Sequence, residues 1–101
     1  MIKELKDKLK IIADYYGYSN QKEQTVEEMA ELMVALNKFN RYGNFQRERR
    51  LNEIITELAD VKIMTSQLSY LLDCENLVDK EIEYKINRTL RTIEKEKNKQ
   101  N

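Results

Sequence analysis

The sequence predicts an all-α protein whose helices pack as a four-helix antiparallel bundle. Three observations favour this fold class. The 101 residues include no proline and only two glycines, so few positions interrupt a helix. Apolar residues recur at helical spacing along most of the chain, and the segments between these amphipathic stretches are short. Short connections place successive helices side by side and antiparallel.

The first two helices are expected on either side of Gly17. The first spans about residues 2–16, and Gly17 is suited to the left-handed conformation that ends a helix. The second helix reaches Phe39. Its start is open, because Thr25 fits a capping box with the glutamate three residues later, while residues 19–20 offer equally good caps.

Two further helices complete the predicted bundle. A turn at residues 40–44, which contains Gly43, precedes a helix over about residues 45–72, roughly 40 Å long at about 1.5 Å per residue. Such a rod extends beyond the core of so short a chain, so we expect it to contact another subunit. After a turn at residues 73–76, the last helix carries one apolar stripe, made of Val78, Ile82, Ile86, Leu90 and Ile93. The polar residues 94–101 are expected to fray.

Composition limits the possible functions. Residues 1–101 are enough for a single domain. Lys plus Arg equals Asp plus Glu at 18 each, so no broad cationic surface for nucleic acid is expected. No apolar run is long enough for a membrane span, and the start lacks a secretory signal, so we expect a cytoplasmic protein without a membrane partner.

Missing residue types also restrict the chemistry. The sequence has no histidine, which excludes a histidine-based triad, a histidine general base and the usual zinc ligand sets. The single cysteine, Cys74, allows no internal disulfide. Any catalysis must therefore use carboxylates, cations, amides or hydroxyls.

Acidic residues gather on the two middle helices at positions that are unfavourable for isolated charges. Glu27, Glu28 and Glu31 lie within one turn of the second helix. Glu57 lies at the edge of the apolar stripe of the third helix, with Asp60 one turn later. Burying a charged carboxylate at such an edge costs roughly several kcal/mol of folding free energy unless a positive group lies beside it.

The antiparallel arrangement predicts a metal site between these helices. Face to face, Glu28 and Glu31 would meet Glu57 and Asp60 around one small volume. All-oxygen ligands favour Mg²⁺, for which Mn²⁺ can substitute. Such a cluster suits phosphate chemistry, because the metal offsets developing charge and lowers the pKa of a bound water.

Three glutamates are candidates for the catalytic group. Glu27 and Glu53 lie one helical step outside the predicted ligands, and either could hold or deprotonate the attacking water. Glu28, itself a predicted ligand, is grouped with them. The sequence does not choose among the three.

At these residues the chain resembles the all-α nucleoside triphosphate pyrophosphohydrolases, the MazG-like superfamily, and especially its short phage-type members. The resemblance rests on Glu27-Glu28-Met29-Ala30-Glu31 and Glu57-Leu58-Ala59-Asp60, on Tyr16-Gly17 with Gln21 or Gln24, and on Tyr84-Lys85-Ile86-Asn87-Arg88. It implies hydrolysis of a (d)NTP to the monophosphate and pyrophosphate, with Mg²⁺ held by Glu28, Glu31, Glu57 and Asp60. It also implies house-cleaning of nucleotide pools by a homodimer or homotetramer.

Substrate-binding residues are expected near these motifs. Phosphate contacts are assigned to Lys85 and Arg88 on the last helix, and a sugar or phosphate contact to Asn37. Tyr16 and Gln24, which precede the acidic residues in the sequence, are further candidates for substrate binding. The chain has no tryptophan, so base stacking falls to one of four aromatic residues: Tyr15, Tyr16, Tyr42 or Phe45. The arginines around the second turn, Arg41, Arg47, Arg49 and Arg50, are either solvated or steer the triphosphate.

A second function hypothesis belongs to another class. The chain is then a catalytically inactive helical interaction or regulatory protein on the same scaffold. The neutral, heavily charged surface and the long coiled-coil-like third helix support it.

Overall fold

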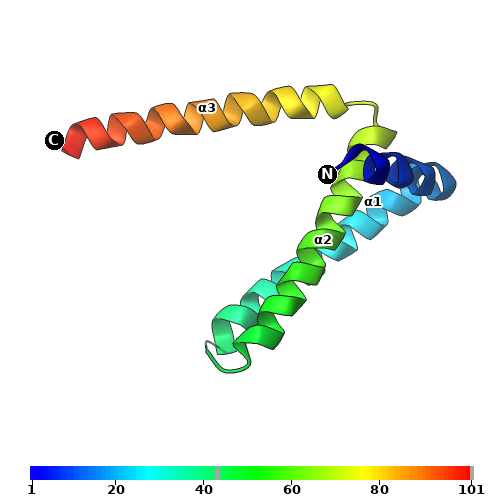
Figure 1. Cartoon of the computed structure of the whole chain (residues 1–101), viewed down its shortest axis with the longest axis horizontal. Helices are drawn as coiled ribbons and strands as arrows, with labels where there is room; N and C mark the ends of the chain where they lie inside the picture. Colours follow the sequence, from blue (N-terminus) through cyan, green and yellow to red (C-terminus); the bar gives the residue numbers. More distant parts are fainter. Residues whose placement is uncertain (43, 101) are drawn as a thin grey trace.

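The chain folds as three helices in a computed structural model that describes residues 1–42 and 44–100. Helix α1 spans Lys3–Tyr42, α2 spans Arg47–Leu71 and α3 spans Glu75–Gln100, and the described residues contain no strand. The second half of α1 and all of α2 lie side by side and antiparallel, whereas α3 leaves this pair as a single rod (Figure 1). The all-α class is therefore confirmed.

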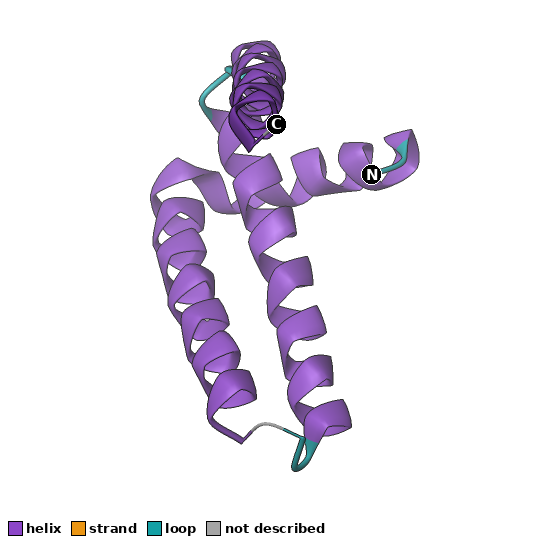
Figure 2. Ribbon diagram, turned by 90° about the vertical axis from the view of Figure 1, so that its left-hand side faces the viewer, coloured by secondary structure: helices purple, strands orange, loops and turns teal. Residues whose placement is uncertain are grey.

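The predicted break between the first two helices is a kink inside α1. Gly17 has φ 82° and ψ 168°, and the helix resumes directly after it. The N-terminal segment, residues 3–16, is thereby set across the helical pair (Figure 2). The side-chain amide of Asn20 donates to the Tyr16 carbonyl across the kink at 2.8 Å. Thr25 is not a cap, because it lies within the helix and its hydroxyl donates to the Gln21 carbonyl at 2.6 Å.

A polar contact holds the N-terminal segment against α2. The Tyr70 hydroxyl donates to a carboxylate oxygen of Asp14 at 2.8 Å, and the Lys10 ammonium lies 5.5 Å from the Tyr70 ring centroid. This contact to Asp14 is the largest cause that raises the pKa of Tyr70 above its usual value. The segment is thus fixed by Gly17 at one end and by Tyr70 along its length.

The turn between α2 and α3 falls where the sequence predicts it. Leu72 follows the last residue of α2, Asp73 takes a positive φ of 53°, and α3 begins at Glu75. The other predicted turn glycine, Gly43, lies outside the described residues. The polar segment from Glu94 onward continues α3 as helix to Gln100.

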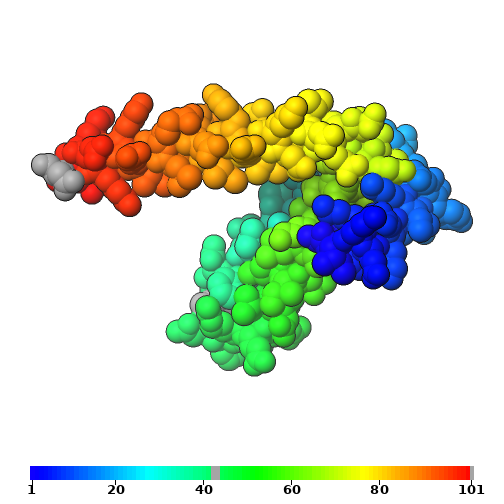
Figure 3. Space-filling model, turned by 45° about the horizontal axis from the view of Figure 1, so that its top comes forward, coloured from blue at the N-terminus to red at the C-terminus, as the bar shows by residue number. Residues whose placement is uncertain are grey.

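The predicted four-helix bundle does not form within one chain. Helix α3 has no buried residue, the residues of its apolar stripe are exposed, and the helix projects as a rod from the rest of the molecule (Figure 3). The radius of gyration is 17.6 Å, compared with about 13 Å for a compact domain of this length. The difference arises because the short turn at residues 72–74 directs α3 away from the helical pair.

The hydrophobic core of the chain is small. Only four apolar residues are buried among those described: Ala13, Ala35, Ile54 and Met64. Large apolar side chains remain exposed on every helix, including Leu5, Met33 and Leu58. No helix in the described ranges has an apolar stretch long enough to cross a bilayer.

Candidate functional site

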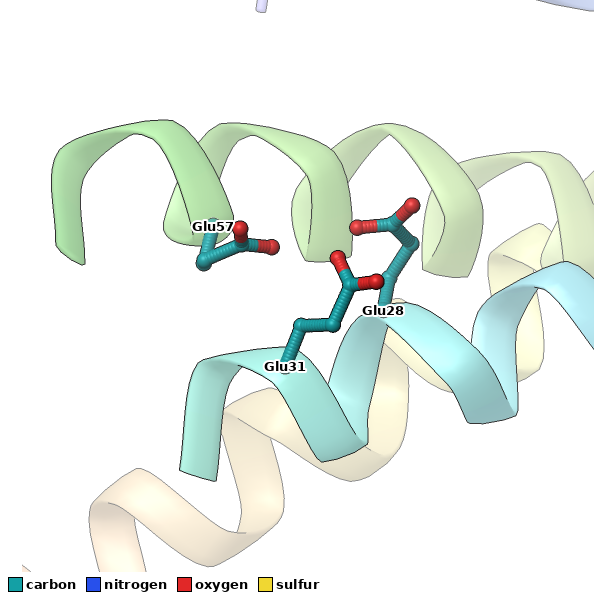
Figure 4. Close-up of side chains that lie close together, drawn as sticks. All are labelled: Glu28, Glu31 and Glu57. Carbon is teal, nitrogen blue, oxygen red and sulfur yellow. The ribbon is translucent and has the colours of Figure 1, made fainter. Parts of the chain in front are cut away.

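Three predicted metal ligands meet between α1 and α2. Each of Glu28, Glu31 and Glu57 offers a carboxylate oxygen, and these three atoms all lie within 4.8 Å of one another. Glu28 and Glu31 project from α1 toward Glu57 on α2 (Figure 4). We call these three residues the acid cluster. The structure thus brings together side chains that are far apart in the sequence, as the antiparallel pairing predicts.

The carboxylates of the acid cluster repel one another. Repulsion from Glu28, followed by desolvation, raises the pKa of Glu31 above its ordinary value. Desolvation, followed by repulsion from Glu31, raises the pKa of Glu57. Desolvation and repulsion between carboxylates contribute to both shifts, and a bound cation would offset the repulsion.

Two oxygen atoms of the cluster are buried without a partner. They are Oε2 of Glu28 and Oε2 of Glu57, which have no hydrogen bond within the described chain. The other oxygen of Glu28 accepts a hydrogen bond from the side-chain amide of Gln24 at 2.8 Å. Since buried carboxylate oxygens are normally satisfied, these two atoms and the all-oxygen donor set fit a hard divalent cation.

The fourth predicted ligand, Asp60, lies at the edge of the cluster. It is half-buried, and desolvation followed by repulsion from Glu28 raises its pKa. Its carboxylate does not belong to the group of oxygens that lie within 4.8 Å of one another. Asp60 is therefore a neighbour of Glu28 and is not a member of the acid cluster in this structure.

Hollows open on both sides of the acid cluster. The first, which we call the acid groove, has a volume of about 420 Å³ and is lined by Glu27, Ala30, Glu31, Val34, Ala35, Lys38, Glu53 and Glu57. The second, the amide hollow, has a volume of about 480 Å³ and is lined by Tyr16, Asn20, Gln21, Glu23, Gln24 and Glu27. Glu27 borders both, so of the candidate catalytic residues it is the one that lies between them.

Glu53 is already paired with arginines. The Nη1 atom of Arg50 donates to both carboxylate oxygens of Glu53, at 3.1 and 3.2 Å, and Arg49 lies 3.8 Å away. The Arg50 side chain is only 13% exposed. These contacts offset the charge of Glu53 and occupy its oxygens, which makes it a weaker candidate than Glu27 for taking a proton from water. Arg47 instead lies over the Phe39 ring, 5.0 Å from its centroid.

The predicted substrate residues separate into two groups. Tyr16 and Gln24 line the amide hollow beside the acid cluster. Lys85 and Arg88 are exposed on α3, where Arg88 lies over the Tyr84 ring, so one chain does not bring them to the acids. Asn37 is exposed and lines neither hollow.

Of the candidate stacking residues whose side chains are described, only Tyr16 borders the site. Tyr16 lines the amide hollow and makes an edge-to-face contact with Tyr15, with ring centroids 4.9 Å apart. Tyr15 and Phe45 are highly exposed and line neither hollow, and the side chain of Tyr42 lies outside the described residues. The structure adds Lys38, which the sequence reasoning missed although it lies seven residues after Glu31 on the same helical face.

Comparisons with protein-family models, with curated proteins and with solved structures found no match for this chain. The function must therefore be inferred from the acid cluster, the two hollows beside it and the acidic residues that the sequence places on α1 and α2.

Proposed function

We propose that this protein is a Mg²⁺-dependent nucleoside triphosphate pyrophosphohydrolase of the MazG-like type. Water attacks the α-phosphorus of a (d)NTP, the bond to the oxygen that bridges the α- and β-phosphorus breaks, and the products are a (d)NMP and pyrophosphate. The observation that carries the proposal is the acid cluster, in which three carboxylates from two helices converge within 4.8 Å and two of their oxygens are buried without a partner among the described residues.

Each acidic residue of the site would have a distinct role in metal binding or proton transfer. Glu28, Glu31 and Glu57 would hold Mg²⁺, with Asp60 beside Glu28 as a further ligand. Bound there, the metal would supply charge neutralisation at the phosphates and a more acidic water. Glu27, which borders both hollows, is proposed to take the proton of the attacking water.

The amide hollow is proposed to hold the nucleoside. It combines an aromatic ring, Tyr16, with side-chain amides such as those of Asn20 and Gln24. An aromatic face stacks on any base, and an amide both donates and accepts hydrogen bonds at a base edge. Gln24 also donates to Glu28, which would couple the nucleoside position to the acid cluster.

A homo-oligomer is part of the proposal. The small core and the exposed apolar stripe of α3 leave much apolar surface without a partner in one chain. A second copy of the chain would cover it, as a homodimer or a homotetramer. Assembly is also the route by which Lys85 and Arg88, remote from the acids within one chain, would contribute to a site.

A substrate panel tests the proposal. The full-length protein is incubated with canonical and modified (d)NTPs in MgCl₂ or MnCl₂, and pyrophosphate is measured. We expect pyrophosphate from at least one nucleotide, and a fall of about 100-fold or more for Glu57→Gln, because a metal supplies several kcal/mol of charge stabilisation. Exposed Glu83→Gln on α3 is the matched control and should retain activity.

The alternative, an inactive helical interaction or regulatory protein, predicts a different result from the same samples. The unpartnered stripe of α3 supports it, because an amphipathic helix that projects freely is suited to binding another helix. Under this alternative no nucleotide in the panel yields pyrophosphate, and Mg²⁺ and Mn²⁺ leave the melting temperature unchanged.

A further inference from the structure

Among the described residues, Lys38 is the one basic residue that lines the acid groove. Four of the eight lining residues are glutamates, namely Glu27, Glu31, Glu53 and Glu57. The Lys38 side chain is exposed, and within the described ranges it forms no ion pair with any of them. A cation that borders a groove of acids and is not neutralised by them is available to an anionic ligand.

The position of Lys38 places it at one end of the groove. It follows Glu31 by seven residues on α1, which puts both residues on the same face and about 10 Å apart along the helix axis. Helical side chains lean toward the N-terminus, and Lys38 lines the same groove as the acids, so its side chain is long enough to reach an anion held between them. The same antiparallel pairing that joins Gln21 to Gln67 brings Lys38 level with Arg50, so cationic residues gather at this end.

The amide hollow lies at the opposite end. Its lining residues precede Glu28 on α1, whereas Lys38 follows Glu31. Along α1 the order is therefore an aromatic and amide hollow, then the acid cluster, then a cation. A nucleoside triphosphate has the same order of chemical groups: a base and sugar, then the phosphate that is attacked, then the phosphates that leave.

We propose that Lys38 binds the two distal phosphates of the substrate, the part released as pyrophosphate, and so sets the direction in which the nucleotide lies. This inference rests on the proposed function. The ammonium offsets the repulsion between the triphosphate and the glutamates of the groove, and it meets phosphate as a compact, flexible charge. Lys38 is thus a substrate-binding residue distinct from Lys85 and Arg88.

Binding of inorganic pyrophosphate tests the inference directly. Titration calorimetry in MgCl₂ compares the full chain with Lys38→Met, Lys38→Arg and the control Lys22→Met, an exposed lysine on α1 outside both hollows. Lys38→Met should weaken pyrophosphate binding about 10- to 100-fold, the usual range for a hydrogen bond between charged groups. Binding of the nucleoside monophosphates of the panel should stay unchanged, Lys38→Arg should retain part of the affinity, and Lys22→Met should match wild type.

The outcomes separate this inference from the proposed function. If wild type hydrolyses a nucleotide and Lys38→Met binds pyrophosphate normally, the role of Lys38 is wrong while the enzyme assignment stands. If wild type hydrolyses nothing yet binds pyrophosphate through Lys38, the enzyme assignment fails and the anion contact stands. A loss of pyrophosphate and monophosphate binding to the same degree in Lys38→Met, with helicity retained by circular dichroism, would also overturn the inference.

Discussion

The side-chain amide of Gln21 on α1 donates a hydrogen bond to the side-chain oxygen of Gln67 on α2 at 2.5 Å. Gln67 is 1% exposed and is the largest fully buried side chain among the described residues, and Gln21 is also buried. Glu28 follows Gln21 by seven residues and Asp60 precedes Gln67 by seven, so the glutamine pair and the acids share one face of the antiparallel pair. The glutamines therefore fix the register that brings the acids together.

Removing one glutamine should destabilise the protein more than removing both. Gln67→Leu leaves the Gln21 amide buried without its acceptor, which should lower the free energy of unfolding by about 1–3 kcal/mol. The double variant Gln21→Leu/Gln67→Leu should recover much of that loss, because two apolar side chains face each other. Urea denaturation measures the free energy of unfolding of both variants. The pairing would be contradicted if the loss in the double variant were simply the sum of the losses from the two single substitutions.

The stability of the metal-free protein should fall as pH rises from about 4. The pKa values of Glu31, Glu57 and Asp60 are raised in the folded chain, so the folded state retains protons that the unfolded state has released. Stability is then greatest below the ordinary carboxylate pKa and is lost as these groups ionise. Glu57→Gln carries no such proton and should show a shallower pH dependence. Urea denaturation in EDTA at a series of pH values from about 4 upward measures the free energy of unfolding of both proteins. An identical dependence of that free energy on pH in wild type and Glu57→Gln would refute the expectation.

Divalent cations should raise the melting temperature through the acid cluster. If Asp60 is a further ligand, Asp60→Asn should reduce the shift that MgCl₂ or MnCl₂ produces, because the stabilisation by a bound cation rises with the logarithm of its affinity for the folded state. A loss of about tenfold in affinity or more is expected for one carboxylate ligand. Glu83→Gln on α3 is the control. A full shift in Asp60→Asn would limit the site to Glu28, Glu31 and Glu57.

Gly17→Ala should destabilise the kink through backbone strain at the residue itself. Apart from the adjacent backbone, no heavy atom of the described residues lies within 4 Å of the position that a Cβ atom would take, so the cost comes from φ 82° and ψ 168°. We expect a loss of about 1–3 kcal/mol in the free energy of unfolding. Ser19→Ala, in the helix just beyond, should change it by no more than about 0.5 kcal/mol. Equal stability of Gly17→Ala and wild type would mean that the kink is not maintained in solution.

A charge on the α3 stripe should weaken self-association. Ile86 is exposed in one chain, so Ile86→Lys would be harmless to a monomer, whereas in an oligomer it would place an ammonium in a buried interface. We expect sedimentation to show association weakened by about tenfold or more. Tyr84→Lys, which replaces an exposed apolar residue on the opposite face, should have little effect. A wild-type protein that sediments as a monomer at all concentrations would refute the oligomer.

Local features of the fold were predictable from the sequence because they depend on neighbouring residues. Gly17 was expected to end a helix and does take a positive φ, and the expected helix over residues 45–72 is α2, Arg47–Leu71. Thr25 was misleading, since a threonine followed by a glutamate three residues later also occurs inside a helix, where the hydroxyl bonds to the carbonyl one turn back.

Long-range features were predictable only in part. Periodicity showed that Glu57 lies at the edge of an apolar stripe, and the antiparallel pairing placed it near Glu31, as found. Periodicity does not determine where an amphipathic helix goes, so the direction of α3 and the separation of Lys85 from the acids were not foreseen. Lys38 was missed because its significance comes from the groove that it lines, which exists only in three dimensions.

The contact between Tyr70 and Asp14 has an effect beyond its own surroundings. It fixes the N-terminal segment, residues 3–16, whose last residue, Tyr16, directly precedes the kink at Gly17. Tyr16 lines the amide hollow, whose other lining residues also lie on α1. The position of Tyr16 in that hollow consequently depends on a contact with α2. Tyr70→Phe, which removes the hydrogen bond to Asp14, would therefore change the shape of the amide hollow although Tyr70 does not line it.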